Sequence, residues 1–335
     1  MKLSVCITTR NRAGSIGMTL ESILRQCPEQ VEVVVVDGAS TDGTASVVQE
    51  IATRYPQLRL ICAHENSGLD ADYDRSIREA RGEYCWLFAD DDLLVPQAVE
   101  RVLVACKERA LVIVTDASVH NSDFSELEQA RRLPFPGQEH YRADESAIFF
   151  QDCAWHLTFI GVVIVQREFW LSRERPRYYG CEFIHCGVLF QAPIPGKILV
   201  IREPLVQIRN GVGNWVNRWF EIWMYKWPRL IWSFTWIDEA VRRAILEAEP
   251  WRSPERLLSA RSSGYYGWRQ FRKLVVPRAR RPTHLWAPLL VALVPVKSAN
   301  SLAAYLQLRK QVRHRSKVHL TRLARLLRSA VPRNR

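Results

Sequence analysis

The sequence predicts an α/β protein with a mostly parallel sheet covered by helices on both faces. Two observations lead to this fold class. Short apolar runs alternate with helical patterns through residues 2–116, and charged residues follow several of these runs directly. Continuous apolar strands separated by helices are typical of parallel sheets buried on both sides. Ligands of such sheets bind beyond the carboxyl ends of the strands, where the charged residues are expected to meet.

The first half of the chain supplies five strands and four helices. Strands are predicted at residues 2–9, 31–37, 58–63, 84–89 and 110–116. Helices are predicted at residues 15–26, 44–55, 70–81 and 96–106. Ile16, Leu20 and Ile23 show the helical spacing of apolar residues, and Pro96 suits a first helical turn.

The pattern loosens beyond residue 117. The polar, proline-containing residues 121–137 predict a surface loop or a short helix. Residues 155–165 return to a strand pattern, and a helix is expected at about 180–191. Residues 197–210 resemble a strand pair or hairpin.

Composition indicates a folded protein with a local excess of positive charge. The 335 residues are 47% hydrophobic and 24% charged, enough for one large domain and a smaller one. The net charge is +12, but ten Lys and Arg lie in residues 301–335, which contain no Asp or Glu. The remaining body is near neutral, which argues against a nucleic-acid-coating protein and for a local anionic contact.

A change of character after residue 214 predicts two domains, residues 1–214 and a helical region at residues 215–335. Tryptophan recurs through residues 215–236, and residues 284–297 are apolar but short and proline-rich for a membrane span. The chain ends in a basic amphipathic stretch. Tryptophan favours the membrane interface and basic residues favour anionic headgroups, so we expect a membrane-associating region. The alternative is a helical subdomain whose tryptophans form its core.

Eight cysteines are present without a C-x-x-C pair, which favours reduced thiols and a cytoplasmic protein. The first strand begins almost at Met1, so no signal peptide is expected.

Three consecutive aspartates follow the fourth predicted strand, in L-F-A-D-D-D-L-L at residues 87–94. Asp90 and Asp92 have the D-x-D spacing that can direct two carboxylates at one hard cation. Mg²⁺ and Mn²⁺ prefer such oxygen ligands and share them with substrate phosphates. The alternative is a solvated turn or a helix cap.

Three stretches resemble glycosyltransferase family 2, whose members have the GT-A fold. They are S-V-C-I-T-T-R-N-R at 4–12, E-V-V-V-V-D-G-A-S-T-D-G-T at 32–44 and A-R-G-E-Y-C-W-L-F-A-D-D-D-L-L at 80–94. The resemblance covers residues 2–115 well and 150–215 loosely. It implies a metal-dependent, inverting transfer of a sugar from a nucleotide-sugar donor, with Mg²⁺ or Mn²⁺ as cofactor.

The resemblance also implies roles for individual residues. Thr8, Arg10 and Asp37 would line the nucleotide pocket, where Asp37 can accept a hydrogen bond from a pyrimidine N–H. Asp91 takes the position of the metal-bound aspartate, and Asp90 or Asp92 would add a contact to ribose or metal. We assign the metal to Asp91 and Asp92. The other donor-binding candidates are Thr9, Asp70, Asp72, Asp90 and Arg209.

Several positions depart from the family pattern. Ala89 stands where the acidic motif usually begins, and Gly38 replaces a common second aspartate. D-A-D-Y-D-R-S at 70–76 replaces a stretch of small residues, which puts the ribose contact in doubt. Together with residues 80–94, this stretch most resembles the abequosyltransferase-like branch, which transfers dideoxyhexoses from CDP-sugars in O-antigen assembly.

An inverting transfer needs a general base, for which the resemblance points to the start of the helix at 180–191. Glu182 would be the base, and His185, three residues later on the same helix face, a metal or phosphate ligand. The alternatives are a surface glutamate and a core histidine, and Asp152 or Asp144 as base. Trp155 and His156 could line the acceptor site or belong to a core strand.

Arg209 lies in R-N-G-V-G-N-W, where two glycines allow movement and the arginine could close onto a diphosphate. The G-x-G within this stretch lacks the strand–turn–helix setting of a dinucleotide fingerprint.

Two other classes of protein share some of these sequence features. A nucleotidyltransferase acting on sugar phosphates should show a glycine-rich phosphate loop, and T-T-R-N-R-A-G-S is poor in glycine. A nucleic-acid binder should have a basic body. The expected partners are therefore a nucleotide-sugar donor, a lipid-linked glycan acceptor and an anionic membrane surface, and no nucleic acid. The expected location is the cytoplasmic, inner face of the plasma membrane, where the enzyme would serve lipopolysaccharide or other cell-surface polysaccharide assembly.

Overall fold

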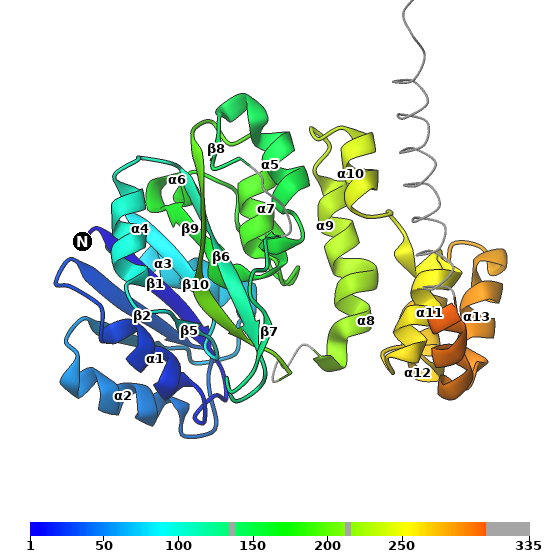
Figure 1. Cartoon of the computed structure of the whole chain (residues 1–335). Coiled ribbons are helices and arrows are strands. Elements are labelled where there is room, and N and C mark those ends of the chain that lie inside the picture. The colour runs from blue at the N-terminus through cyan, green and yellow to red at the C-terminus, as the bar shows by residue number, and fades with distance from the viewer. Residues whose placement is uncertain (134–137, 212–215, 306–335) are drawn as a thin grey trace, which may run out of the picture. The chain divides into compact units, whose positions relative to one another are not determined.

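A computed structural model describes residues 1–133, 138–211 and 216–305 (Figure 1). Two compact units emerge from the contacts. Residues up to 214 and Lys226–Ala248 form the first unit, while the second comprises the segment ending at Tyr225 and the residues from Glu249 onward. The predicted boundary at residue 214 thus marks where the chain leaves the first unit, but Lys226–Ala248 return to it.

The first unit is built on one ten-stranded sheet in the order β3-β2-β1-β4-β9-β6-β10-β5, with β7 beside β6 and β8 beside β10. Strands β1 to β4 pair with one another in parallel, and β6 pairs with β10 in parallel. Strand β9 is antiparallel to both β4 and β6, and the short strands β5, β7 and β8 also pair antiparallel. The predicted mostly parallel sheet is confirmed. The strands are β1 Leu3–Thr9, β2 Val31–Asp37, β3 Leu58–Cys62, β4 Tyr84–Phe88, β5 Leu93–Leu94, β6 Val112–His120, β7 Leu127–Gln129, β8 His140–Tyr141, β9 Val163–Gln166 and β10 Ile198–Arg209.

Helices flank this sheet, as the alternating pattern predicts (Figure 1). The apolar side chains that predicted the first helix are fully buried. The helices of the first unit are α1 Ile16–Leu24, α2 Thr44–Arg54, α3 Leu69–Glu79, α4 Ala98–Cys106, α5 Ser146–Cys153, α6 Arg167–Leu171, α7 Ile184–Phe190, α9 Trp227–Ser233 and α10 Glu239–Ile245. Helix α5 was not predicted.

Strand register brings the carboxyl ends of distant strands to one edge. Thr9 pairs with Asp37 across β1 and β2, and Ile7 pairs with Phe88 of β4, two residues before Asp90. At the other side of the sheet, Arg209 pairs with His120. The charged residues that follow these strands therefore gather where a parallel sheet offers its ligand site.

Two strand predictions are wrong. Residues 155–165 form two short 3₁₀ turns, His156–Thr158 and Ile160–Val162, and only their end joins β9. A short apolar run fits a buried turn as well as a strand, and here the Gly161 carbonyl accepts a hydrogen bond from Trp86 Nε1 (2.9 Å).

Residues 197–210 form one strand, β10, instead of the predicted pair. Its pairing with β6 shifts register on both sides of Pro204. Proline has no N–H for the ladder, so the strand bulges there and continues without turning back.

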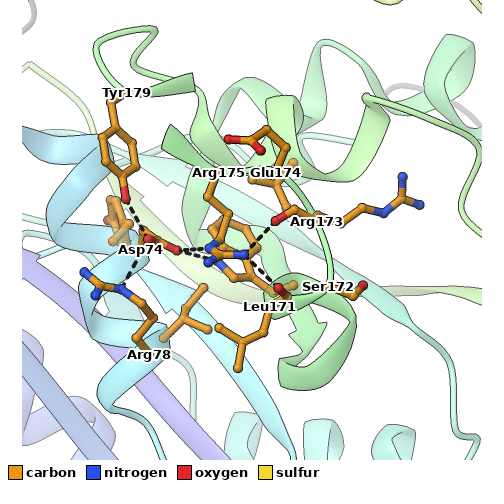
Figure 2. A network of polar contacts seen from close by, with 12 residues as sticks. Asp74, Arg78, Leu171, Ser172, Arg173, Glu174, Arg175 and Tyr179 are labelled. Atoms are coloured by element: carbon orange, nitrogen blue, oxygen red, sulfur yellow. Dashed lines mark hydrogen bonds and ion pairs between the residues drawn. The ribbon is translucent and has the colours of Figure 1, made fainter. Parts of the chain in front are cut away.

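Asp74 of helix α3 ties the segment at 170–179 to the sheet (Figure 2). Its carboxylate is 2% exposed and accepts hydrogen bonds from Trp170 Nε1 (3.0 Å) and the Tyr179 hydroxyl (2.7 Å). It also pairs with Arg175 Nε (2.9 Å) and Arg78 Nε (3.3 Å). Arg175 in turn donates to the carbonyls of Leu171 and Arg173, which fixes the path of the chain ahead of α7.

The tryptophan-rich stretch is divided between the two units. In the first unit Trp227 is fully buried and packs on Phe183, with ring centroids 4.7 Å apart, while Trp236 Nε1 donates to the Phe190 carbonyl. None of the tryptophans described at 219–236 is exposed. The alternative interpretation therefore fits the tryptophans described here, because their side chains pack within the protein.

The second unit is a small helical domain with its own apolar core. It contains helices α8 Trp219–Glu221, α11 Pro254–Ser262, α12 Trp268–Gln270 and α13 Trp286–Leu293. Its core consists of Phe220, Met224, Trp251, Leu257, Ala260, Tyr266, Phe271, Val275 and Ala292. The basic tail at 306–335 lies outside the described residues.

Among the described helices, none alone has the length and apolarity needed to cross a bilayer. Pro282–Leu293 and Val296–Tyr305 pass that test only as a pair, and they are bent by 107° relative to each other.

The Asp74 contacts predict a large stability effect. Asp74→Ala removes a buried carboxylate and leaves the Arg175 guanidinium and the Trp170 N–H without their partner. Breaking a buried pair by removing one member costs about 3–5 kcal/mol. We expect a loss of this size in the free energy of unfolding, measured by denaturant titration.

Asp144→Ala is the matched control for Asp74→Ala, because Asp144 pairs with Arg142 on the surface, where its side chain is 71% exposed. It should leave the unfolding midpoint unchanged. Equal midpoints for the two variants would contradict the assigned role of Asp74.

Candidate active site

The loops after β1 and β2 are joined into one platform at the carboxyl edge. Asn11 adopts a positive φ of 55°, and its side-chain oxygen accepts a hydrogen bond from Thr41 N (2.8 Å). Asn11 N donates to Ser40 Oγ (2.9 Å), and Ser40 N donates to Asp37 Oδ1 (2.9 Å). The platform therefore holds the Asp37 carboxylate at the end of β2, beside the buried end of β1.

The predicted nucleotide-binding residues of the first strand lie on this platform. Thr8 and Thr9 are buried at the end of β1, and Arg10 is exposed directly after them. Burial raises the pKa of the Asp72 carboxyl, and the charge of the nearby Arg10 opposes that rise. The structure thus brings Thr8, Thr9, Arg10 and Asp37 together with Asp72.

Asp72 lies over Gly38, the position at which the family pattern usually has a second aspartate. A side chain at Gly38 would place its Cβ 2.6 Å from Asp72 Oδ2, so any other residue here would require the Asp72 carboxylate to move. Ser67 Oγ donates to the other oxygen of Asp72 (2.5 Å). Burial raises the pKa of Asp72, and the nearby Asp37 carboxylate adds to this effect. Gly38 and Asp72 both depart from the family pattern, and the Asp72 carboxylate occupies the space that a side chain at position 38 would need.

The aspartate run faces a cation that the sequence prediction did not name. Arg12 Nε lies 3.5 Å from Asp90 Oδ1, and Arg12 Nη2 lies 3.4 Å from Asp91 Oδ2. Burial, and then the neighbouring Asp91, raise the pKa of Asp90 to about 6, although Arg12 opposes them. Arg12 sits in the T-T-R-N-R stretch that follows β1, so its position after the first strand was the available signal.

Asp92 links this run to the end of β10. Asp92 is 2% exposed, and its Oδ1 accepts a hydrogen bond from Arg209 N (2.7 Å). Its Oδ2 is buried and has no hydrogen-bond partner in the described part of the chain. Burial, and then Asp91, raise the pKa of Asp92 well above its usual range.

The Arg209 side chain lies on the Phe124 ring, 4.7 Å from its centroid, and its charge acts on Asp91 and Asp92. Cation–π packing of this kind orients a guanidinium without using its N–H donors. Its Nε is buried without a hydrogen-bond partner among the described residues. The structure therefore places Arg209 beside the acidic run, and its predicted contact with a diphosphate stays a prediction.

The donor set fits a hard divalent cation in part. Asp91 and Asp92 offer two carboxylates, and the unpartnered Asp92 Oδ2 is an oxygen of the kind that Mg²⁺ or Mn²⁺ binds. Within the described ranges, no three His, Cys, Asp or Glu side chains are grouped closely enough to hold a metal ion. Such ions commonly take one or two carboxylates and complete their shell with substrate phosphates and water.

His185 is not part of this donor set, contrary to the prediction. It is 1% exposed in α7, and its Nε2 is hydrogen-bonded to the Leu157 carbonyl oxygen (2.7 Å). Burial lowers the pKa of His185 to about 4, so the ring is neutral. The alternative interpretation, a core histidine, describes it.

Asp70 was predicted to bind the donor, but it faces away from the Asp37 platform. Its two carboxylate oxygens accept hydrogen bonds from Glu182 N (2.8 Å) and Ile184 N (3.1 Å), at the start of α7. It is 3% exposed, and burial raises its pKa to about 6. Asp70 therefore holds the turn that presents Glu182.

Glu182, the predicted base, occupies a constrained turn. Its φ is +72°, a left-handed conformation that non-glycine residues rarely adopt. It precedes α7, so the predicted shared helix face with His185 is wrong. Glu182 Oε1 lies 2.9 Å from Lys226 Nζ, which also donates to the Gly180 carbonyl (2.8 Å). Lys226 had no local signal in the sequence, because its partner lies 44 residues away.

The acceptor-site candidates separate in the structure. His156 is 2% exposed, its Nε2 is hydrogen-bonded to the Thr115 carbonyl oxygen (2.8 Å), and burial lowers its pKa to about 4. Trp155 is 45% exposed. Of the alternative bases, Asp152 accepts a hydrogen bond from the Tyr141 hydroxyl (2.9 Å), and Asp144 forms an ion pair with Arg142. His156 is thus a core residue, whereas Trp155 is exposed and its ring centroid lies 6.3 Å from that of Trp227.

Sequence comparisons identify relatives of the first unit. Residues 4–163 match the family model of Glycosyl transferase family 2. Abequosyltransferase RfbV of Salmonella typhimurium is 25% identical over 230 residues, which are 63% of this chain and 67% of that protein. Chondroitin synthase of Escherichia coli is 34% identical over 101 residues, 30% of this chain and 15% of its own length.

Solved structures share the fold. TarS of S. aureus in complex with UDP-GlcNAc superposes with a TM-score of 0.55 at 18% identity, over 83% of this chain and 77% of that chain. Mannosyltransferase PcManGT from Pyrobaculum calidifontis, in complex with GDP-Man and Mn²⁺, superposes with a TM-score of 0.53 at 18% identity, over 91% and 84% of the two chains. These likenesses confirm the predicted GT-A type of fold.

Asp70 predicts a pH dependence of stability. Its folded-state pKa of about 6 exceeds the ordinary value of 3.8, so the folded protein binds this proton more tightly than the unfolded chain. The contribution favours folding below about pH 4 and is lost as the pH rises through about 6, a change of about 3 kcal/mol. Asp70→Asn should flatten this part of the curve of unfolding free energy against pH.

The control for Asp70→Asn is Glu65→Gln, because Glu65 is exposed on a loop. This variant should keep the wild-type slope. An unchanged slope in Asp70→Asn would show that the Asp70 carboxyl does not titrate in this pH range in the folded protein.

Proposed function

We propose that this chain, a glycosyltransferase whose residues 4–163 form a family 2 domain, moves a sugar from a UDP- or CDP-linked donor to a lipid-linked glycan. The observation that carries the proposal is the single sheet edge that gathers Asp37 and Asp72 at one side and Asp91, Asp92 and Arg209 at the other. Base-reading acceptors and a charged phosphate site are the two parts that a nucleotide diphosphate needs. The names of RfbV and of TarS bound to UDP-GlcNAc support this donor class and cell-surface polysaccharide or O-antigen assembly.

The platform of Asp37 and Asp72 would receive the nucleobase. Both carboxylates are buried acceptors, and the missing side chain at Gly38 allows the Asp72 carboxylate to lie close to the end of β2. A cytosine amino group offers two N–H donors, whereas the same edge of uracil offers one. Two acceptors at this place suit a cytosine at least as well as a uracil, which agrees with a CDP-linked dideoxyhexose as one donor candidate. Thr8, Thr9 and Arg10 border the same platform, and Asp90 would contact the ribose.

Asp91 and Asp92 would hold Mg²⁺ or Mn²⁺ against the donor diphosphate. When bound, the cation neutralises negative charge that develops on the leaving nucleotide. Arg209 would close its guanidinium onto the same phosphates, since arginine matches phosphate oxygens with two parallel N–H donors. The Mn²⁺ in the PcManGT complex with GDP-Man supports this choice of metal.

Glu182 would take the proton from the acceptor hydroxyl as the sugar is transferred with inversion. Asp70 fixes the backbone of Glu182, and Lys226 holds its carboxylate. A lysine contact keeps the glutamate from rotating freely, so the acceptor meets a prepositioned oxygen. Trp155, whose exposed ring lies 6.3 Å from the ring of Trp227 directly after Lys226, would offer an apolar face to an acceptor sugar.

The proposed acceptor class would bring the protein to a membrane. A lipid-linked glycan is presented at a bilayer surface, and residues 256–335 contain 19 Lys and Arg without any Asp or Glu. This charge would hold the protein on anionic headgroups, each basic residue contributing roughly 1 kcal/mol near the surface. The proposed location is accordingly the cytoplasmic face of the plasma membrane, with peripheral attachment.

Metal removal gives the first test of the function. Slow hydrolysis of CDP- and UDP-sugars by the full chain, measured with Mn²⁺, should disappear in excess EDTA. Asp91→Asn should lose nearly all of it, because one charge at the cation is removed without a change of volume. Asp123→Asn is the control, since Asp123 is an exposed residue that bonds only within its own turn. Full activity of Asp91→Asn or in EDTA would refute the metal assignment.

The second test concerns the base. Glu182→Gln should lower the transfer rate at least ~10²-fold, the usual scale of general-base catalysis. Nucleotide affinity should stay near wild type, because this residue faces the acceptor. Glu174→Gln, at an exposed glutamate eight residues earlier, should keep full turnover. Normal turnover of Glu182→Gln would transfer the role to Asp152 or Asp144.

A further inference from the structure

Helix α13 exposes a continuous apolar stripe. Trp286, Leu290 and Leu293 are 65%, 64% and 62% exposed, among the most exposed large apolar side chains of the described residues. Their spacing of four and then three residues places them on one face of the helix. Three neighbouring large apolar side chains at this exposure form a patch of the kind that marks an interaction site.

The opposite face of α13 is firmly packed. Ala292 belongs to the core of the second unit and Pro288 is buried, while Leu285 and Leu289 pack against the same core. The Tyr266 hydroxyl donates to the Pro288 carbonyl (2.8 Å) inside the domain. The exposed stripe is therefore displayed by an anchored helix, and it cannot be buried by a simple rotation of that helix.

The apolar surface continues past the end of α13. Val296, Leu302 and Tyr305 are 40%, 47% and 57% exposed in the next helix, Val296–Tyr305, which is bent by 107° from the preceding one. An eight-residue helix is about 12 Å long, too short to cross a hydrocarbon core of about 30 Å. A bent pair of short amphipathic helices suits a position in the plane of a bilayer surface.

The charges around this surface have one sign. The last acidic residue of the sequence is Glu255, and every one of the 19 charged residues at 256–335 is Lys or Arg. Arg280 and Arg281 are exposed before α13, and Lys297 is exposed after it. Apolar side chains between cationic flanks match the acyl boundary and the anionic headgroups of a lipid surface.

We propose that the α13 face, formed by Trp286, Leu290 and Leu293, is the membrane-inserting surface of this protein and that Arg280, Arg281 and Lys297 contact anionic headgroups beside it. The occupant is an anionic lipid bilayer. The proposal rests on the lipid-linked acceptor of the proposed function and names the part of the chain that meets the membrane. The sequence-based expectation gave this contact to the tryptophans at 215–236 and to the basic tail at 301–335. The proposal differs because none of the tryptophans described at 219–236 is exposed, whereas the α13 face is.

The first experiment uses the full chain and co-sedimentation with phosphatidylcholine vesicles that contain phosphatidylglycerol. The triple variant Trp286→Ser, Leu290→Ser, Leu293→Ser should bind at least about tenfold more weakly, because three side chains lose their apolar insertion. The control triple variant is Val104→Ser, Leu127→Ser, Ile148→Ser, whose parent residues are 55%, 56% and 46% exposed in the first unit. It should bind like the wild type.

The second experiment separates insertion from charge. Arg280→Gln, Arg281→Gln, Lys297→Gln should weaken binding to phosphatidylglycerol-containing vesicles and reduce its dependence on salt. In vesicles with brominated acyl chains, Trp286→Phe should keep binding but lose much of the tryptophan quenching. Trp155→Phe, at an exposed tryptophan of the first unit, should lose little of it.

Three outcomes would overturn the proposal. Wild-type vesicle binding by the α13 triple variant, with binding abolished instead by deletion of residues 306–335, would assign the membrane contact to the tail. A change from dimer to monomer in the triple variant at unchanged vesicle binding would make the face a contact between two copies. Unaltered quenching in Trp286→Phe would exclude insertion of this helix.

Donor hydrolysis without vesicles separates this proposal from the proposed function. The α13 triple variant should hydrolyse the nucleotide sugar like the wild type, because its substituted residues lie outside the family 2 domain. A wild-type protein that binds vesicles but hydrolyses no nucleotide sugar would contradict the function and leave the α13 face supported.

Discussion

Three buried carboxylates on helix α3 determine how the first unit is assembled around its site. A buried charge needs partners, so each of these aspartates fixes another part of the chain. Asp70 and Asp74, four residues apart, share the helix face toward the segment at 170–184 and hold it by backbone N–H groups and by Arg175. Asp72 lies two residues from each, on the other side of the helix, and points to Gly38 at the end of β2. One helix thereby positions the platform at Asp37 on one side and the turn of Glu182 on the other.

Arginines from two distant segments offset part of the repulsion within the aspartate run. Arg12 pairs with Asp90 and Asp91, and the charge of Arg209 lowers the pKa of Asp91 and Asp92 against the effect of burial. Burial still raises the pKa of Asp90 and Asp92, so the two arginines compensate only in part. This residual deficit is the electrostatic argument for the cation proposed at this edge. A strand end that stores carboxylate repulsion favours any positively charged group that reaches it, and the proposed donor with its divalent metal would bring such a group.

The fold was predictable where periodicity and strand chemistry agree, and less so where tertiary contacts decide. The first four strands and helices, with Asp37 and the aspartate run at their ends, followed from apolar patterns and from the topology of parallel sheets. The turns at 156–162 did not, because their apolar residues satisfy a buried turn that Trp86 and Arg132 hold in place. His185 and His156 looked like ligands by type, yet each is neutral and bonded to a backbone carbonyl. Lys226 and the turn capped by Asp70 depend on pairs more than 40 residues apart, which no local pattern encodes.

Composition was least informative in the tryptophan-rich stretch, because burial of a large aromatic side chain depends on what the fold brings against it. The same run of sequence contributes Phe220 and Met224 to the core of the second unit and Trp227 to the first. Lys226 is the first residue of the part that returns to the first unit, and its ion pair with Glu182 anchors the chain at that point. The partner of the proposed base is thus set by where the chain re-enters the catalytic unit. The most exposed large apolar side chains of the described residues lie instead on α13, where only one of the three is a tryptophan.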